Sequence, residues 1–522
     1  MLTRPLAPDA AMVEPPPPLA GRAARGRRLV RTLGVPLLFL AASLLLRAIG
    51  FAQAVIDTDE GLYIVQAREW LRGGWPLVAV WDMHPIGAPA MIAATFALIG
   101  ESIAAVRLLG TVCVAATAWA LHGLVRAGGG PRPAGIAAGL LYIAFSLRLG
   151  GLATNTEILF APFVAAAMLI GTTAARRVLV LAEAPRWRDL VLMGLAIGAG
   201  FAVKPVVTPE GCLAFALLAF PALWLRLLPL PRFLAMAAAY AGLCLLPTAL
   251  FGLAYALRGE FMAFLDGSFL APFRYSHGRL PLPEAARLSL VAALVLTWPV
   301  VLAGLAAWRW ARRRGADGRL ARIGLLWFAA ASLAIIGPGF FFQHYFLIWL
   351  PPLCLLAALG AWRLARAGRA RLAFAFVIGA VIADSWLGAF VPRLDRGIGY
   401  ALPDPVREVA AAVAAEIAPG DRILVANYHP VVYFLAGAEV PTRFVFPAHL
   451  TGAFGRVSDI DMDAEVRRVL ESRPRVVVVD RGWWWTMRPA VAEAVSATLA
   501  QDYELAAKVP EERGPVEIWR RR

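Results

Sequence analysis

The sequence predicts a mainly helical membrane protein, a bundle of about eleven transmembrane helices followed by a small α/β domain. Of its 522 residues, 60% are hydrophobic and only 16% are charged, whereas soluble globular chains have about half apolar and a quarter charged residues. The apolar residues fall in continuous blocks of roughly 15–25, the length that crosses a ~30 Å hydrocarbon layer as a helix. After residue 391 the composition becomes that of a soluble protein.

The arginine-rich segments orient this bundle. Residues 1–33 predict a disordered, basic cytoplasmic tail, and residues 34–391 predict the membrane domain, with 56–102 as its first outer loop. We interpret 87–99 as re-entrant or interfacial, because the later arginine-rich loops then all fall in the cytoplasm. The expected spans are 35–55, 103–125, 134–149, 156–175, 189–203, 208–225, 233–257, 285–308, 322–337, 344–362 and 372–391.

The net charge of +16 fits the same picture. Arginines in cytoplasmic loops contact anionic lipid headgroups, so the charge indicates a membrane surface rather than a nucleic-acid partner. The four cysteines lie inside apolar blocks without paired spacing, which predicts core residues rather than disulfides or a metal site.

Residues 395–522 predict a soluble α/β domain on the outer side. Helix and strand patterns alternate, which is typical of a partly parallel sheet. No glycine-rich phosphate loop follows any strand, so we expect no nucleotide site there. The expected helices are 405–417, 466–472 and 489–500, and the expected strands are 422–427, 475–480 and 516–519.

The first outer loop gathers the polar residues that best predict chemistry. Asp59 and Glu60 follow Asp57 at the start of an expected interfacial helix over 62–71, whose residues 66, 68 and 69 we expect to face water. Asp82 and His84 close the same loop. Carboxylates near a membrane are costly without a partner or a purpose. Asp59 could act as general base, and Asp59 with Asp82 could hold Mg²⁺ or Mn²⁺.

Other charged residues sit where expected spans meet the outer face. Asn155 and Glu157 open one span, and we expect them, with Asp82, to orient an acceptor or a metal ion. Lys204 ends another span, where snorkelling to headgroups is the simpler alternative to phosphate binding. The candidate phosphate ligands are Lys204, His84, Arg107, Arg274, His344 and Tyr345.

The order of these motifs resembles a known family. Asp59-Glu60 with Tyr63, then Asp82-Met-His-Pro, Gly100-Glu-Ser and Val106-Arg-Leu are similar to the dolichyl-phosphate-mannose-protein mannosyltransferase-like superfamily of GT-C glycosyltransferases. Later motifs extend the resemblance over residues 35–391. They are Ala153-Thr-Asn-Thr-Glu157, Phe201-Ala-Val-Lys204-Pro205 and His344-Tyr345 through Pro351-Pro352.

The resemblance implies a polyprenyl-phosphate-linked sugar donor, a site that faces the periplasm, and inverting direct displacement. It maps the acidic motif onto Asp59 and Glu60, with Asp59 as the base. At Asp82 the family usually continues with a lysine and two prolines, whereas this chain has His84 and Ile86. A histidine is a cation for the carrier phosphate only when it is protonated.

We therefore expect a multi-pass glycosyltransferase of a bacterial inner membrane, a hexosyl- or pentosyltransferase. It would use a polyprenyl-phosphate sugar and a cell-envelope acceptor such as lipopolysaccharide, another glycan or a protein. One rival is a transporter or flippase of lipid-linked sugars, which would bury charges at mid-membrane on paired halves. The acidic residues gather at one face and no repeat is visible. A binding protein without activity is a third alternative.

Overall fold

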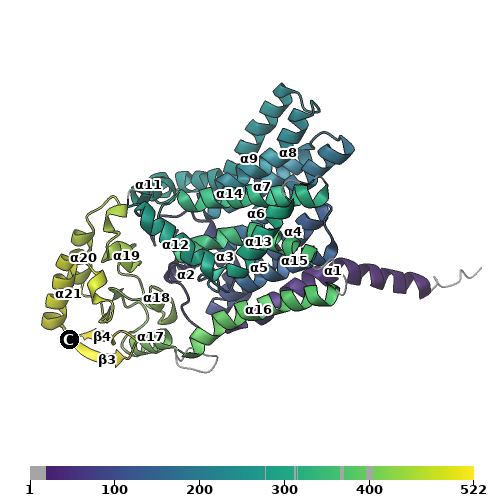
Figure 1. Cartoon of the computed structure of the whole chain (residues 1–522). Helices are drawn as coiled ribbons and strands as arrows, with labels where there is room; N and C mark the ends of the chain where they lie inside the picture. Colours follow the sequence, from purple (N-terminus) through teal and green to yellow (C-terminus); the bar gives the residue numbers. More distant parts are fainter. Residues whose placement is uncertain (1–18, 277, 311–312, 314, 365–369, 396–403) are drawn as a thin grey trace, which may run out of the picture.

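A computed structural model describes residues 19–522 apart from 277, 311–312, 314, 365–369 and 396–403 (Figure 1). The chain is mostly helical, with one small sheet near its C-terminus. The expected fold class, a polytopic helical bundle followed by α/β structure, is confirmed. Residues 1–18 of the expected cytoplasmic tail lie outside the described residues, whereas residues 19–33 form the start of helix α1.

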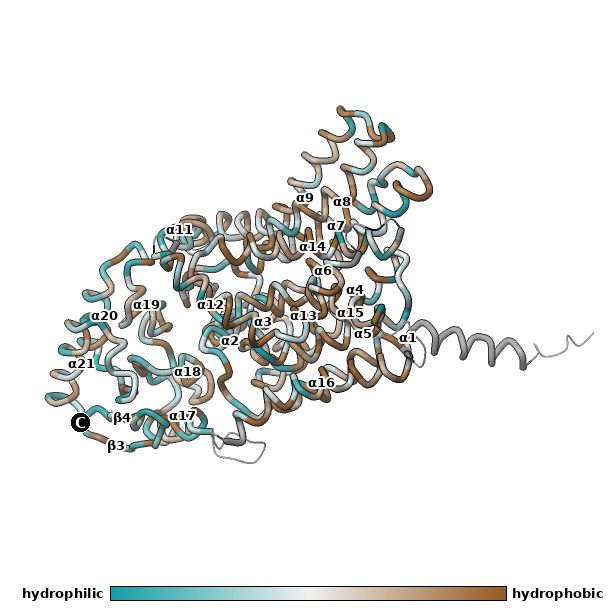
Figure 2. The backbone as a smooth tube through the Cα atoms, viewed as in Figure 1, coloured by the Kyte–Doolittle hydropathy of each residue, from teal (hydrophilic) through white to brown (hydrophobic). Residues whose placement is uncertain are grey.

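Every apolar block of the sequence becomes a helix of the bundle. Figure 2 shows these helices mostly brown, the colour of hydrophobic residues. The membrane part contains α1 (Leu19–Arg47), α2 (Thr58–Leu71), α3 (Gly87–Ile99), α4 (Ile103–Ala127), α5 (Arg132–Phe145), α6 (Thr156–Leu181), α7 (Trp187–Val203), α8 (Thr208–Trp224) and α9 (Leu230–Leu257). It continues with α10 (Phe261–Leu265), α11 (Ala271–Ser276), α12 (Leu282–Val295), α13 (Thr297–Trp310), α14 (Ala316–Ile336), α15 (Leu350–Leu364) and α16 (Ala370–Asp395).

Eight helical segments of the described residues are long and apolar enough to cross a membrane, and α12 with α13 makes a ninth if that bent pair is one span. The chain is therefore a multi-pass membrane protein. Two further expected spans correspond to the shorter helices α5 and α7. The count of about eleven spans stays a prediction.

Helix α3 does not carry the chain across the bundle. The Arg107 guanidinium near the start of α4 donates to the Gly50 carbonyl just beyond α1, at 3.0 Å. One turn further on, the Ser43 hydroxyl donates to the Thr111 carbonyl at 2.9 Å. The chain thus leaves α1 and enters α4 at the same level, as expected if residues 87–99 do not span.

The C-terminal region is an α/β layer against one end of the bundle. Its four-stranded sheet has the order β1-β2-β4-β3, with β1 (Ile423–Val425) parallel to β2 (Val476–Asp480). Strand β4 (Val516–Arg521) pairs antiparallel with β2 and with β3 (Tyr503–Val509). The helices are α17 (Pro405–Ala415), α18 (Val431–Leu435), α19 (Pro447–Leu450), α20 (Met462–Glu471) and α21 (Pro489–Asp502). The partly parallel sheet was expected, but β3 was not.

The C-terminal region covers α2, and this corrects the expectation of an interfacial helix. Gln66 and Arg68 were expected to face water, yet both are 1% exposed. The Arg68 guanidinium donates to the carbonyls of Tyr433 and Ala438 at 2.6 and 3.0 Å. Helix α2 is therefore packed between the bundle and the C-terminal region. Figure 1 shows this region at the end of the bundle opposite the start of α1.

Candidate active site

The N-terminus of α2 presents Asp59 at the junction of the bundle and the C-terminal region. Asp57 caps the helix, because its carboxylate accepts from the Asp59 backbone N–H at 3.1 Å. This cap fixes the first turn and places the Asp59 side chain, about one-third exposed, beside the His344 ring.

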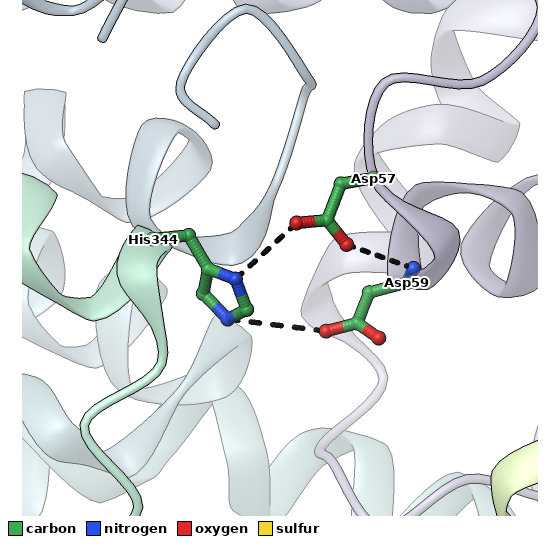
Figure 3. Close-up of side chains that lie close together, drawn as sticks. All are labelled: Asp57, Asp59 and His344. Carbon is green, nitrogen blue, oxygen red and sulfur yellow. Dashed lines mark hydrogen bonds and ion pairs between the residues drawn. The ribbon is translucent and has the colours of Figure 1, made fainter. Parts of the chain in front are cut away.

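The His344 ring faces both aspartates, as Figure 3 shows. Its Nδ1 is 3.3 Å from an Asp57 carboxylate oxygen, and its Nε2 is 3.9 Å from one of Asp59. The Asn155 side-chain amide donates to the Asp57 carboxylate at 3.0 Å. Both ring nitrogens of His344, expected to bind phosphate, thus face carboxylates.

The pKa values of the two aspartates shift in opposite directions. Burial and the neighbouring Asp57 carboxylate raise the pKa of Asp59 to about 6. Burial also acts to raise the pKa of Asp57. The hydrogen bonds that Asp57 accepts from His344 and Asn155 outweigh burial, so the pKa of Asp57 is lower than its ordinary value. A carboxylate with a raised pKa is suited to accept a proton near neutral pH.

Glu60 points away from Asp59, into the bundle. It forms an ion pair with Arg107 and accepts from the Thr154 backbone N–H at 2.7 Å. Both charged side chains are 1% exposed. Glu60, expected to be catalytic, and Arg107, expected to bind phosphate, are therefore placed as partners that fix the bundle around the loop.

Asp82 and His84 form a second pair across the loop from Asp59. The His84 Nδ1 lies 3.0 Å from an Asp82 carboxylate oxygen, and the Met83 N–H donates to the other oxygen at 2.7 Å. Burial acts to raise the pKa of Asp82, but the charge and hydrogen bond of His84 lower it below its ordinary value. Asp82 therefore stays ionised and orients the His84 ring.

Lys204 ends α7 and reaches across to the start of α6. Its Nζ is 2.7 Å from a Glu157 carboxylate oxygen and 3.3 Å from the Thr156 hydroxyl. The same Nζ lies 4.4 Å from the centre of the Tyr345 ring, a favourable cation–π contact. The structure thus brings together Glu157, Lys204 and Tyr345, three residues singled out from the sequence.

A cavity of about 380 Å³, which we call the polar cavity, is lined by Asp57, Asp59, Asp82, His84, Lys204, His344 and Tyr345 among others. An apolar groove of about 520 Å³ adjoins it between α7, α8, α11 and α14. The cavity includes Asp57, Asp59 and Asp82, whereas the groove includes Phe201, Phe269 and Phe273. The residues common to both linings are Met83, His84, Lys204, Tyr275 and Tyr345.

The C-terminal region supplies one wall of the cavity, through Phe446, Ala448, His449 and Phe454. His449 is 3% exposed, and burial lowers its pKa to about 4, so its ring is neutral. These wall residues were missed from the sequence, since nothing local marks a loop that reaches a distant site.

Arg274 lies just outside the cavity. It forms an ion pair with Asp266 at 2.6 Å and donates to the Val457 carbonyl at 2.7 Å. It therefore ties α11 to the C-terminal region, although we expected it to bind phosphate. Its neighbour Tyr275 lines the cavity instead.

Asp57, Asp59 and His344 could together hold a metal ion. One potential ligand atom from each lies within 4.8 Å of the other two. We expected Asp59 with Asp82, but Asp82 pairs with His84. A set with one imidazole fits Mn²⁺ or Zn²⁺ better than Mg²⁺, which prefers oxygen ligands.

Part of the chain matches a known family. A family model described as dolichyl-phosphate-mannose-protein mannosyltransferase matches residues 83–251. No curated protein matches the chain. The matched segment holds the loop from Met83 onward and the bundle through α8 and most of α9.

Solved structures resemble the whole chain. ArnT from Cupriavidus metallidurans bound to undecaprenyl phosphate superposes with a TM-score of 0.62 at 15% identity, covering 93% of this chain and 98% of that one. The archaeal oligosaccharyltransferase AglB from Archaeoglobus fulgidus, in complex with an inhibitory peptide and a dolichol-phosphate, has a TM-score of 0.51 at 14% identity and covers 93% and 74%. The chain therefore has the GT-C glycosyltransferase fold, as its resemblance implied.

Proposed function

We propose that this protein is a membrane glycosyltransferase that moves a sugar from a polyprenyl phosphate to a cell-envelope acceptor. The observation that carries the proposal is the shared wall of the polar cavity and the apolar groove, which holds Lys204, His84 and Tyr345. The groove, the shared wall and the cavity match the three parts of a lipid-linked sugar in order: an apolar chain, a phosphate and a polar sugar. The solved structures of this fold that hold undecaprenyl or dolichol phosphate support the donor class.

In the proposed reaction, the polyprenyl chain lies in the groove and its phosphate lies at the shared wall. An acceptor hydroxyl in the cavity attacks the anomeric carbon from the side opposite the phosphate. The bond from that carbon to the phosphate oxygen breaks, and its electron pair leaves with the carrier phosphate. Asp59 takes the hydroxyl proton, which makes it the catalytic base.

Positive charge at the wall would stabilise the departing phosphate. Lys204 and, when protonated, His84 are positioned for this role, and Asp82 orients the His84 ring. Tyr345 packs against Lys204 and can donate its hydroxyl to the phosphate. Asn155 acts indirectly, by holding the Asp57 cap of α2.

A divalent cation is a separate proposal. Asp57, Asp59 and His344 would hold it, and it would polarise an acceptor oxygen near Asp59. Dialysis against a chelator followed by Mn²⁺ addition tests this: transfer that is lost and then restored supports the cation, and unchanged transfer rejects it.

We further propose that the cavity faces the periplasm of a bacterial inner membrane. The support is that the arginine-rich loops of the sequence alternate with the loops that form the site. Residues 34–391 would form the catalytic membrane domain and 395–522 an outer domain that helps to position the acceptor. Lipopolysaccharide belongs to the proposed class of acceptors, and the sugar is a hexose or a pentose.

The test is sugar transfer by the purified full chain. Wild type, Asp59→Asn and the exposed control Asp459→Asn are incubated with radiolabelled polyprenyl-phosphate sugars and cell-envelope extract. Transfer by wild type and the control, with a loss of about 10²–10⁴-fold in Asp59→Asn, supports the proposal. Equal transfer by Asp59→Asn would remove Asp59 as the base, and flux of lipid-linked sugar across vesicles without transfer would favour the transporter.

A further inference from the structure

A second groove lies at the lipid-facing side of the bundle, away from the cavity. It has a volume of about 510 Å³ and is lined by Arg148 from the loop between α5 and α6, by Thr297 and Trp298 at the start of α13, and by Asp384 and Leu387 of α16. We call it the side groove. It shares no lining residue with the cavity or the apolar groove.

The side groove lies beside the C-terminal end of α5 and the loop that follows it. The Ser385 hydroxyl of α16 donates to the Ala144 carbonyl at 2.9 Å, one residue before α5 ends. The Arg148 guanidinium reaches the Ser385 carbonyl at 3.5 Å. Seven residues after Arg148, the same loop supplies Asn155 to Asp57. The groove therefore opens at the same end of the bundle as the active-site cavity.

The side groove holds two opposite charges, those of Arg148 and Asp384, that do not form an ion pair with each other. Asp384 is exposed on α16. Within the described residues it has no ion pair at 4.0 Å or less. Arg148, half-buried, is close enough for the Asp384 charge to act on it. An ionised side chain at membrane depth is costly unless a partner or ligand compensates it. The two charges thus leave room for a ligand between them.

A break in a helix faces the same groove. Helices α12 and α13 meet at an angle of 91°, and the Thr297 hydroxyl donates to the Leu294 carbonyl at 2.5 Å. At membrane depth, backbone freed by such a break is tolerated where it lines a polar cavity. Trp298 and Leu387 at the rim are 47% and 48% exposed. The groove therefore combines charged and apolar lining residues, as a lipid headgroup with its glycerol and acyl chains requires.

We propose that the side groove binds the headgroup of a zwitterionic aminophospholipid, with its phosphate on Arg148 and its ammonium group on Asp384. The charge pattern carries this choice. An anionic lipid would meet the Asp384 carboxylate without compensation, and a choline headgroup has no N–H to donate to it. The proposal does not depend on the glycosyltransferase activity.

Native mass spectrometry of delipidated full-length protein tests the proposal. The protein in detergent is titrated with phosphatidylethanolamine, phosphatidylcholine or phosphatidylglycerol of the same acyl chains. We expect wild type to prefer phosphatidylethanolamine by about fivefold, because one charge contact at a membrane surface contributes about 1 kcal/mol. Arg148→Gln should weaken binding of all three lipids.

Asp384→Asn gives the sharpest outcome. It removes the ammonium partner and the repulsion of anions together, so preference should shift from phosphatidylethanolamine to phosphatidylglycerol. The controls Arg467→Gln and Asp459→Asn change exposed charges of the C-terminal region and should keep the wild-type order. An equal affinity for the three lipids, or an order that neither groove variant changes, would overturn the proposal. So would a wild-type dimer that dissociates in Asp384→Asn, because a second copy would then occupy the groove.

Discussion

Asp59 and Glu60 are neighbours in the sequence but lie in two different regions of the molecule. Asp59 faces the polar cavity, 3.9 Å from a histidine ring. Glu60 faces the interior of the bundle, where Arg107 and the Thr154 N–H satisfy it. The comparison teaches that a cluster of acidic residues is not one functional unit. The carboxylate without a permanent cation is available for chemistry, and the fully paired one holds the loop in place.

The largest expected effect comes from changing Asp59, the residue that faces the polar cavity. Asp59→Asn keeps the size of the side chain but cannot accept the acceptor proton, so transfer should fall by about 10²–10⁴-fold. Thermal stability at pH 7 should not fall. Burial raises the pKa of Asp59, so its ionised form disfavours folding above about pH 6 and the neutral amide removes that cost. Activity and melting temperature are measured on the same preparation. A loss of both would mean that Asp59, like Glu60, stabilises the fold.

The second prediction concerns the buried ion pair of Glu60 and Arg107. Arg107→Ala leaves Glu60 as a buried charge without its cation, which should destabilise the fold by about 3–5 kcal/mol. The expected result is poor expression or a strongly lowered unfolding midpoint in detergent. The double variant Arg107→Met with Glu60→Leu removes both charges and should recover much of the stability. If the Arg107→Ala protein is stable and only its affinity for undecaprenyl phosphate changes, Arg107 is a phosphate ligand, as the sequence predicted.

A third, smaller effect tests how closely α3 packs against the C-terminal end of α7. A Cβ added at Gly87, where α3 begins, would lie 2.4 Å from the Ala202 carbonyl oxygen, beside Lys204. Because backbone cannot move aside cheaply, Gly87→Ala should cost about 1–3 kcal/mol. Gly242→Ala is the matched control, since nothing lies within 4 Å of its added Cβ. Equal unfolding midpoints for the two variants would contradict the close packing of α3 on α7.

The smallest predicted effect is on pH dependence. With the pKa of Asp59 near 6, its basic form should fall to about one-tenth at pH 5, and transfer should fall with it. The groups that act on Asp59 are Asp57, His344, His84 and Asp82. Since His344 lowers the pKa of Asp59, His344→Gln should move the acid limb of the pH profile upward. A profile that is flat down to pH 5 would argue against Asp59 as the titrating base.

Much of the fold could be predicted from sequence because its signals are local. Apolar blocks of membrane length mark the bundle, and three of the four strands carry β-branched runs or follow turns. Strand β3 was missed because Tyr503–Val509 has alternating polar residues and alanines, which give no strong strand signal. The burial of α2 was missed because Gln66 and Arg68 are polar, and the partners of Arg68 lie more than 350 residues away in the chain.

The site was predictable as a set of residues but not as a set of roles. Asp59, Asp82, His84, Lys204, His344 and Tyr345 were chosen from the sequence, and all line the cavity. Which charge pairs with which depends on side-chain direction, and sequence spacing does not give it. Glu60 and Arg107 pair across 47 positions, and Arg274 contacts Val457 across 183. His449 and Phe454 could not be assigned before the C-terminal region was placed.

In the proposed reaction, the Lys204–Glu157 contact would affect the release of the spent carrier lipid. A lysine with no other partner would retain a phosphate monoester strongly, whereas this one has a resident carboxylate at 2.7 Å that competes for it. In the proposed reaction, the phosphate of the incoming lipid would displace that carboxylate from Lys204, and the carboxylate would return as the spent lipid leaves. We therefore expect Glu157→Gln to tighten binding of undecaprenyl phosphate yet slow multiple turnover, which equilibrium binding and steady-state rates measured together would reveal.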